Sequence, residues 1–449
     1  MASQSAFVQA LIRVVFLLLP LLMLVPGLIW WERRLLSWMQ DRIGPNRVAT
    51  YTFGEKAEMW VPGGKLRWTW PKGLQGKKLK LAGLLQPIAD GVKLFLKEDI
   101  TPTAIDRVIY FVAPAVALFP AFAIAGTLPW GPNPLLTPVA DVNIGILYVL
   151  AVSSLGVYGV VLAGYGSNNK YSLLGGLRAS AQLISYELAM GMSLAAVVLA
   201  TGSLKMTEMV RVQEEPLWGA VPALQNWFLF TPFGALAALI FVVCAVAETN
   251  RAPFDLPEAE NELIAGYHTE YSSMKFAVFF MGEYAAMFVF GGIFAAVFLG
   301  GYNVLPLNWE VLAEQFPGMA GAFKAMGTLN LALAPIWFLG KCVAAITFYI
   351  WLRATLPRLR YDQLMSLGWR SLLPMAVANF LVVALWIVCT SVYGPTGGWI
   401  AVGIAAVVVM VGVTAIIRFS TRTSPMSRPR TIQLVEGRGI DYTEGVAGS

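Results

Sequence analysis

The sequence predicts an all-α, polytopic membrane protein with about nine transmembrane helices and one amphipathic helix at the membrane surface. Of its 449 residues, 57% are hydrophobic and only 13% are charged, whereas roughly 25% of the residues in a soluble domain are charged. Apolar stretches recur along the chain, and each is long enough to cross the hydrocarbon core of a bilayer as a helix. Composition and stretch length together therefore predict a multi-pass membrane protein.

The predicted spans form a single transmembrane domain, residues 1–420, followed by an inside tail, residues 421–449. The spans are residues 8–31, 106–128, 142–165, 178–201, 230–248, 274–300, 333–355, 371–393 and 399–419. The first span lacks the basic flank and the small-residue cleavage site of a signal peptide. We therefore expect it to be retained as a transmembrane helix.

The distribution of basic residues predicts how these helices are oriented. The chain has 32 Lys and Arg and a formal net charge of +6. With the N-terminus outside, only Lys205, Arg211 and Lys324 fall in outside segments, while Arg13 and Lys341 fall within spans. Because positive charge gathers in cytoplasmic loops, we expect an N-out, C-in topology. The same bias explains the basic charge without a nucleic-acid partner.

The first inside loop is predicted over residues 32–105 and opens with a basic cluster. Glu32, Arg33 and Arg34 come first, and Arg42 lies just before the sequence Gly-Pro-Asn at 44–46, which is typical of a tight turn. These arginines are therefore expected beside the turn at the membrane surface. Two interpretations stay open: a collar of side chains that reach the lipid headgroups, and a binding surface.

Later in this loop, residues 84–98 predict an amphipathic helix. Leu85, Ile88, Val92 and Phe95 recur at three- and four-residue steps, which places them on one helical face. Fifteen residues of helix measure about 22 Å, too short to span a bilayer. Such a helix can lie in the interface and border a lateral opening for a lipid-soluble ligand, or it can simply support its neighbours.

Residues 48–80 lie between these two motifs. Residues 60–70 place apolar and polar positions on both sides of a Pro-Gly-Gly turn at 62–64, which predicts a short β-hairpin. The basic run from Lys72 to Lys80 suits either lipid headgroups or an acidic partner.

Acidic residues gather directly after the fifth predicted span, in an inside loop expected over residues 249–273. Five carboxylates and one arginine occupy residues 248–262: Glu248, Arg251, Asp255, Glu258, Glu260 and Glu262. Closely spaced carboxylates titrate as a coupled set, and charge beside lipid usually serves ions, protons or a partner. Glu258 and Glu262 would share one face of a helix that begins near Pro257.

Three ionisable residues fall within predicted spans: Glu187, Glu283 and Lys341. Because charge in a bilayer is costly, we expect them to face the bundle interior and to interact through water or with one another. They can then load and release protons, or they can form a structural tie between helices. His268, the only histidine, also has two open interpretations: a surface or interface residue, and a proton relay.

The sequence contains no motif for a redox or nucleotide cofactor. Cys244, Cys342 and Cys389 fall inside spans without a Cys-x-x-Cys pair, and an iron–sulfur cluster needs about four cysteines. Gly-x-Gly-x-x-Gly and Walker loops are also missing from the sequence. We therefore expect no metal, no flavin and no catalytic redox group in this chain.

Six motifs occur in order along the chain, at residues 32–46, 83–94, 185–187, 248–262, 279–284 and 353–364. The most specific is Glu-Thr-Asn-Arg-Ala-Pro-Phe-Asp-Leu, at residues 248–256. Together they resemble the H-subunit family of bacterial NADH-quinone oxidoreductase, respiratory complex I, whose mitochondrial counterpart is NADH dehydrogenase subunit 1. The chain departs from that family in an insertion at about residues 48–80, in a ninth span and in the tail. These departures affect expected subunit contacts and leave the core motifs intact.

The resemblance implies a multi-pass subunit of a proton-translocating NADH:quinone oxidoreductase in the bacterial inner membrane, bound to other subunits of complex I. It implies a tunnel for quinone, either ubiquinone or menaquinone, as bound substrate, while NADH, FMN and iron–sulfur clusters belong to partner subunits. The quinone entrance is expected at Glu32, Arg33, Arg42, Arg251, Phe254 and Asp255. The coupling path is expected at Glu187, Glu248, Glu258, Glu260, Glu262, Glu283 and Lys341.

Two other classes of protein stay open as alternatives. The membrane subunit of an energy-converting hydrogenase shares several of these motifs but needs no quinone tunnel, so the soluble subunits that co-purify would separate the two. A stand-alone ion transporter usually shows paired repeats with broken spans at matching positions. The sequence shows no such duplication.

Overall fold

The structure is a computed structural model that describes residues 2–46, 50–52, 56–61, 64–69, 78–80, 83–132, 138–217, 221–255 and 265–423. Within those residues it is mostly helical, and six helices are long and apolar enough to cross a membrane. They are α3 (Arg107–Ala125), α4 (Gly145–Gly166), α5 (Lys170–Thr201), α9 (Ser273–Phe298), α12 (Ala334–Thr355) and the helix Tyr361–Gly394. The predicted class is therefore confirmed, while the count of nine spans and the N-out orientation stay predictions.

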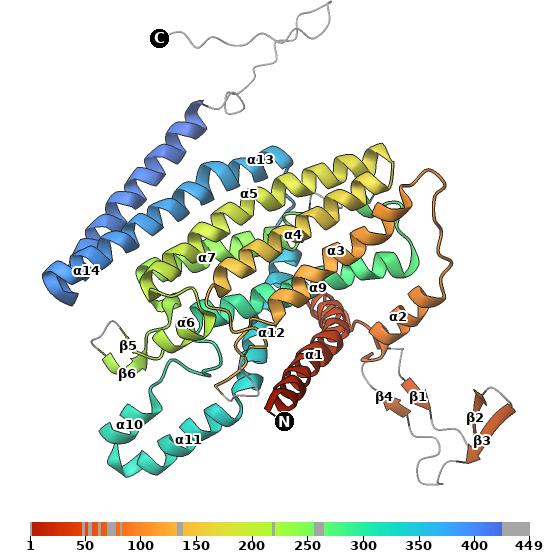
Figure 1. Ribbon diagram of the computed structural model, residues 1–449, viewed down its shortest axis with the longest axis horizontal. Coiled ribbons are helices and arrows are strands. Elements are labelled where there is room, and N and C mark those ends of the chain that lie inside the picture. The colour runs from red at the N-terminus through yellow and green to blue at the C-terminus, as the bar shows by residue number, and fades with distance from the viewer. Residues whose placement is uncertain are drawn as a thin grey trace, which may run out of the picture.

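The other predicted spans lie in helices of different length. Helix α1 (Ala2–Met39) contains the first and extends beyond it, and α7 (Pro232–Glu248) has 17 residues. The last two both lie in α14 (Leu373–Thr423), which follows α13 (Tyr361–Ser366) and the π-helical turn Leu367–Leu372. At Gly394 the backbone has φ 77°, a conformation that glycine adopts without steric cost. The chain turns back there, and the two parts of α14 diverge from the turn like the arms of a V (Figure 1).

Short elements connect the long helices. The helices are α2 (Gln86–Leu96), α6 (Met206–Val212), α10 (Trp309–Gln315) and α11 (Ala320–Ala332), with 3₁₀ turns at Phe228–Phe230, Gly266–His268 and Pro317–Met319. The strands are β1 (Thr50–Thr52), β2 (Lys56–Val61), β3 (Gly64–Thr69), β4 (Lys78–Lys80), β5 (Pro216–Leu217) and β6 (Val221–Gln225). They pair as antiparallel ribbons, β1 with β4, β2 with β3 and β5 with β6. The predicted hairpin at residues 60–70 is thereby confirmed.

Helices α3, α4, α5, α7 and α9 form the centre of the bundle (Figure 1). Small residues allow these helices to approach closely, as is common in membranes. A Cβ atom added to Gly159 of α4 would lie 2.5 Å from the backbone nitrogen of Ala117 in α3. One added to Gly175 of α5 would lie 2.8 Å from the Cα of Gly266. A larger side chain at either glycine would separate elements that carry the site described below.

Polar residues begin several of these helices. Asp106 accepts hydrogen bonds from the backbone N–H groups of Val108 and Ile109 at the start of α3. Thr231 accepts one from Gly234 at the start of α7, where Pro232 occupies the first turn. Such caps satisfy N–H groups that have no partner inside the helix.

The predicted inside loop begins later than expected, because α1 continues to Met39. Glu32, Arg33 and Arg34 are therefore helical. The predicted amphipathic helix is confirmed as α2, and its apolar residues Ile88 and Phe95 are 58% and 72% exposed. An apolar helical face without protein cover is what a helix at the lipid interface requires.

Candidate functional site

Arg251 lies at the centre of a buried cluster of charges. Its side chain is 8% exposed and reaches two carboxylates from different helices. The distance from Nη1 to Oε1 of Glu32 in α1 is 3.5 Å, and that from Nη2 to Oε2 of Glu283 in α9 is 3.7 Å. The guanidinium also lies 4.5 Å from the ring centre of Tyr284. Arg251 therefore connects the end of α1 to the middle of the bundle.

The electrostatic surroundings keep Arg251 charged. Burial alone would lower the pKa of the guanidinium, but the acidic groups of Tyr284, Glu283 and Glu32 outweigh burial and raise that pKa above its ordinary value. A buried charge is tolerated only when it is paired in this way. The loop residue Arg251 thus acts as a fixed positive charge between two carboxylates.

Glu32 receives two further partners. The Tyr284 hydroxyl donates a 2.6 Å hydrogen bond to its Oε2 atom, and Arg353 in the last turn of α12 pairs with its Oε1 atom. Neighbouring residues on a helix point about 100° apart, so Glu283 and Tyr284 contact different sides of the cluster. Four segments of the chain meet at this point: α1, α9, α12 and the loop after α7.

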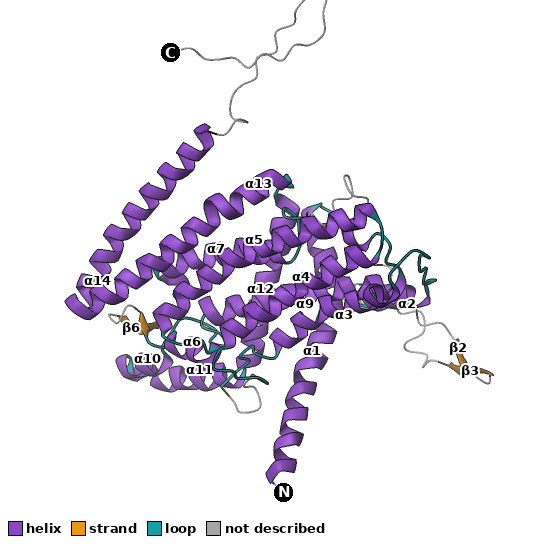
Figure 2. Ribbon diagram, turned by 45° about the horizontal axis from the view of Figure 1, so that its top comes forward, coloured by secondary structure: helices purple, strands orange, loops and turns teal. Residues whose placement is uncertain are grey.

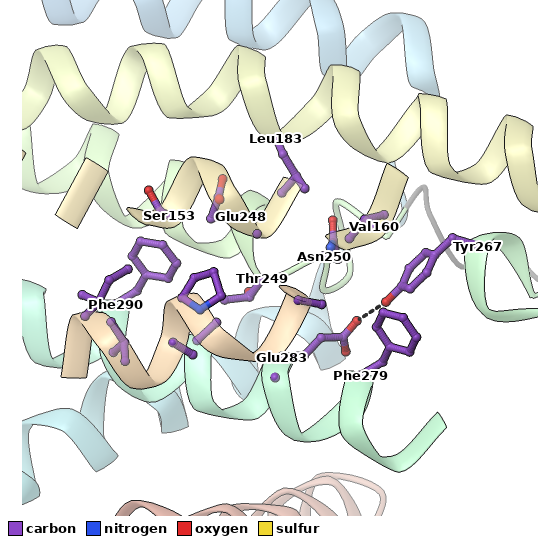
Figure 3. Close-up of a pocket in the computed structure, with 18 residues that line it drawn as sticks. Ser153, Val160, Leu183, Glu248, Thr249, Asn250, Tyr267, Phe279, Glu283 and Phe290 are labelled. Atoms are coloured by element: carbon purple, nitrogen blue, oxygen red, sulfur yellow. Dashed lines mark hydrogen bonds between the residues drawn. The ribbon is translucent and has the colours of Figure 1, made fainter. Parts of the chain in front are cut away.

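Glu283 also borders a cavity between α3, α4, α7 and α9 (Figure 3). The Tyr267 hydroxyl donates a 3.2 Å hydrogen bond to Oε1 of Glu283. The cavity has a volume of about 90 Å³, which is room for a few ordered waters. Its polar lining residues are Ser153, Glu248, Thr249, Asn250, Tyr267 and Glu283. The rest of the lining is apolar, so these polar groups are what can hold ordered water there.

The far end of the cavity carries two carboxylates of the predicted coupling path. Glu248 ends α7 and lines the cavity. Ser153 also lines it and donates a 2.9 Å hydrogen bond to Oε1 of Glu187 in α5. Glu187 and Glu248 are close enough to feel each other's charge. The structure thus places Glu248 and Glu283 in the lining of one cavity, while Glu187 lies behind Ser153 and is hydrogen-bonded to it.

The corner after α7 is held in place by a residue that sequence analysis did not single out. Gln182, fully buried in α5, donates 2.8 Å hydrogen bonds to the carbonyl oxygens of Ala247 and Phe254. Between them, Asn250 has φ 51°, a conformation in which asparagine is enriched. This corner directs Arg251 toward Glu32 and Glu283.

Phe254 and Asp255 lie beside this corner. The Phe254 ring is buried against Tyr186, at 5.4 Å between ring centres. An Asp255 carboxylate oxygen lies 3.4 Å from the Arg358 guanidinium. Glu258, Glu260 and Glu262, with the helix predicted near Pro257, lie outside the described residues.

The predicted entrance residues Arg33 and Arg42 line an open groove near the end of α1. Leu36, Ser37 and residues 41–45 complete its lining. Arg33 forms a 2.7 Å ion pair with Asp90 of α2, which ties the two helices together. The exposed Arg42 donates a hydrogen bond to Gln40. Arg33 and Arg42 are thus brought together, but separately from Arg251.

Lys341 and His268 lie apart from the carboxylates. Lys341 donates to the carbonyl oxygens of Leu299, Gly301 and Asn303, at the C-terminal end of α9. That end is about 22 Å along the helix from Glu283, so the structure does not bring Lys341 to the cavity. His268 is 8% exposed and packs edge-on against the Tyr267 ring. Exposure at the protein surface is thus excluded for His268, and its role as a relay stays a prediction.

Several contributors were missed, although two had a signal in the sequence. Tyr284 directly follows Glu283, and Arg353 ends a span inside a motif that was already noted. Ser153, Tyr267 and Gln182 carry no such signal because their roles depend on contacts between distant helices. Among the described residues, no three His, Cys, Asp or Glu side chains converge as metal ligands.

The chain is similar to proteins that belong to one enzyme. The family model described as NADH dehydrogenase matches residues 12–384. An H subunit of NADH-quinone oxidoreductase from Koribacter versatilis is 41% identical over 395 residues, which cover 84% of this chain and 96% of that protein. The H subunit from Thermomicrobium roseum is 43% identical over 379 residues, which cover 82% of this chain and 94% of that protein. Subunit 8 of the NADH-quinone oxidoreductase from Rhodothermus marinus is 41% identical over 373 residues, which cover 83% of this chain and 95% of that protein.

Proposed function

We propose that this chain, which belongs to the H-subunit family of NADH-quinone oxidoreductases, forms much of the quinone path of respiratory complex I. In this membrane subunit, quinone reduction would be coupled to proton translocation. The redox centres are expected in partner subunits of the hydrophilic arm, and the location in the bacterial inner membrane. The hydrogenase and transporter alternatives are not favoured, because the relatives above carry the oxidoreductase name.

The single observation that carries the coupling proposal is the chain of contacts from α12 to the cavity. It runs from Arg353 through Glu32, Arg251 and Glu283 to Tyr267. Each charged group interacts with the next, so a change in charge at one end alters the energy of protonation further along. Negative charge that develops when quinone is reduced near the cluster would disturb Arg251 first, and the cavity carboxylates next.

The quinone path is proposed to begin at α2. We expect the exposed apolar residues of α2 to face the lipid, and the Arg33–Asp90 ion pair joins α2 to the groove at the end of α1. Trp38 and Ile43, beside this groove, are 53% and 69% exposed. An apolar border with a few polar groups is what a quinone with an isoprenoid tail requires.

The groove can be tested with Arg42→Ala in the assembled enzyme. We expect NADH:quinone reductase activity to fall about tenfold, because a positioning contact to the substrate is lost. Electron transfer from NADH to a hydrophilic artificial acceptor should stay near the wild-type rate. An equal loss of both activities would indicate misassembly and would contradict a role on the quinone path.

A further inference from the structure

Helix α2 borders the bundle but packs little of its surface into it. Of its 11 residues, all of which the structure describes, only Pro87 is buried. The helix lies at the edge of the bundle in both views (Figures 1 and 2). Most helices are held in place by a buried apolar face, which α2 lacks. Its position therefore depends on polar contacts, of which the Arg33–Asp90 ion pair with α1 is one.

The start of α9 supplies a second set of polar contacts, at the opposite end of α2. The Ser273 hydroxyl donates a 2.9 Å hydrogen bond to the carbonyl oxygen of Leu94, in the last turn of α2. Just beyond α2, Ser272 Oγ accepts a 2.9 Å hydrogen bond from the backbone N–H of Ile100 and lies 3.2 Å from Oδ1 of Asp99. Two neighbouring hydroxyls thus hold both the end of α2 and the segment that follows it.

Lys275 adds a charged contact that is largely shielded from water. Its side chain is 13% exposed, and its ammonium group forms a 3.0 Å ion pair with Oδ2 of Asp99. The same ammonium group lies 4.9 Å and 4.5 Å from the ring centres of Tyr110 and Phe111 in α3. These rings favour a cation at that place. We call the three residues at the start of α9 the latch: Ser272, Ser273 and Lys275.

The backbone at the latch has an uncommon conformation. Ser273 has φ 54°, and few residues other than glycine have a positive φ. Such a conformation persists only where the surroundings fix it, and it is concentrated at functional sites. Here it occurs at the residue whose hydroxyl holds Leu94.

A single helix carries both the latch and part of the buried charge cluster. Glu283 lies in α9, about 15 Å along the helix axis from Ser273. Since α9 is continuous between these residues, the latch fixes the end of α2 relative to Glu283 and Arg251.

We propose that the latch and Asp99 set the position of α2 at the quinone entrance, and thereby determine how readily a quinone with a long isoprenoid tail enters the path. A long tail must pass along the apolar border that α2 provides, whereas a short-tailed quinone needs less of that border. The latch acts through α2 and has no contact with quinone, so its members are positioning residues. The inference rests on the quinone path proposed above.

The latch can be broken with Asp99→Lys, which places a second cation beside Lys275. Glu98→Lys is the matched control, because Glu98 is exposed and forms no ion pair with any residue that the structure describes. KM and kcat are measured for the assembled enzyme in proteoliposomes, with its own long-tailed quinone and with the decyl analogue of that quinone. Electron transfer from NADH to a hydrophilic artificial acceptor establishes assembly.

The position of α2 is monitored independently of turnover. A spin label is attached at Leu96→Cys, in the last turn of α2, where the native side chain is 77% exposed. The background carries Cys389→Ser, because Cys244 and Cys342 are buried. The width of the spectral lines then reports how mobile this end of α2 is in each variant.

In Asp99→Lys, KM for the long-tailed quinone should rise about fivefold, while kcat and the KM for the decyl analogue should change less than about twofold. The spin label should become more mobile in Asp99→Lys and stay as in the wild type in Glu98→Lys. Asp99→Glu keeps the charge and should restore both the KM and the mobility.

Unchanged label mobility in Asp99→Lys would overturn the latch and leave the quinone path, which Arg42→Ala tests, unaffected. Increased mobility without a selective rise in KM for the long-tailed quinone would overturn both the inference and a quinone path at α2. If Asp99→Lys fails to assemble, the milder Asp99→Asn is judged by the same two measurements.

Discussion

The carboxylates at the two ends of the central cavity have different partners. At one end, Glu283 shares Arg251 with Glu32, and Arg353 and Tyr284 complete the cluster. At the other end, Glu187 accepts a hydrogen bond from Ser153. Among the described residues, neither Glu187 nor Glu248 forms an ion pair.

This difference separates two roles within one site. Where a buried carboxylate is paired with arginine, the pair fixes both charge and position, and removal of one partner leaves an uncompensated charge. Where a buried carboxylate has only a hydroxyl and a cavity with room for a few waters beside it, a neutral amide can replace it with little change in packing. We therefore expect substitutions at the Arg251 end to damage structure and function together, and substitutions at the Glu187 end to affect proton movement selectively.

The largest effect is expected for Arg251→Gln, which leaves Glu32 and Glu283 without their shared cation. Breaking a buried pair in this way costs about 3–5 kcal/mol, so the melting temperature of the enzyme should fall and quinone reduction should be lost. The same change at Arg211, whose pair with Glu208 is 75% exposed on the arginine side, should cost well below about 1 kcal/mol. Equal stability of the Arg251→Gln and Arg211→Gln variants would show that the buried ion pairs of Arg251 do not stabilise the protein.

A smaller effect is expected for Glu283→Gln. Arg251 then keeps Glu32, and the amide oxygen can still accept the hydrogen bond from Tyr267. Loss of one charge-assisted contact costs about 2 kcal/mol, measured as a partial decrease in melting temperature, and proton pumping should fall with it. Glu310→Gln, on an exposed part of α10, serves as the control. A fully stable and fully coupled Glu283→Gln enzyme would show that the contact with Arg251 is incidental.

The smallest effect is expected for Ser153→Ala, which removes one hydrogen bond to Glu187. A single bond of this kind contributes about 1 kcal/mol, so stability and quinone reduction should change little. Ser180→Ala is the matched control on α5, since that hydroxyl is exposed and, within the part of the chain that the structure describes, bonds only inside its own helix, to Leu177. If Ser153→Ala prevented assembly and Ser180→Ala did not, the contacts of Glu187 would be structural, which would contradict the proposed difference between the two ends of the cavity.

The transmembrane class could be predicted from the long apolar stretches of the sequence. The carboxylates near the cavity could be predicted as well, because charge in an apolar span is conspicuous. Glu187 and Glu283 stood out for that reason. The connecting role of Arg251 could not be predicted, since it requires α1, α9 and α12 to meet at one point. The α1 boundary was placed too early because charged residues at a span end resemble a loop, while Glu32 is helical and buried in the cluster.

Lys341 shows the opposite limitation. Its position within a span suggested a place on the proton path, but its three carbonyl partners lie at the far end of α9. Sequence reports depth along one helix and says little about which face or which neighbours a residue meets. Position relative to Glu283 depends on how α12 packs against α9, and only the fold supplies that.

The most direct test of the coupling account is the number of protons pumped per NADH oxidised in the Glu187→Gln enzyme. Glutamine keeps the shape and the hydrogen bond to Ser153 but removes the titration. In sealed vesicles, the account predicts an assembled enzyme that reduces quinone at nearly the wild-type rate and pumps fewer protons per NADH. A wild-type ratio in both Glu187→Gln and Glu283→Gln would contradict it.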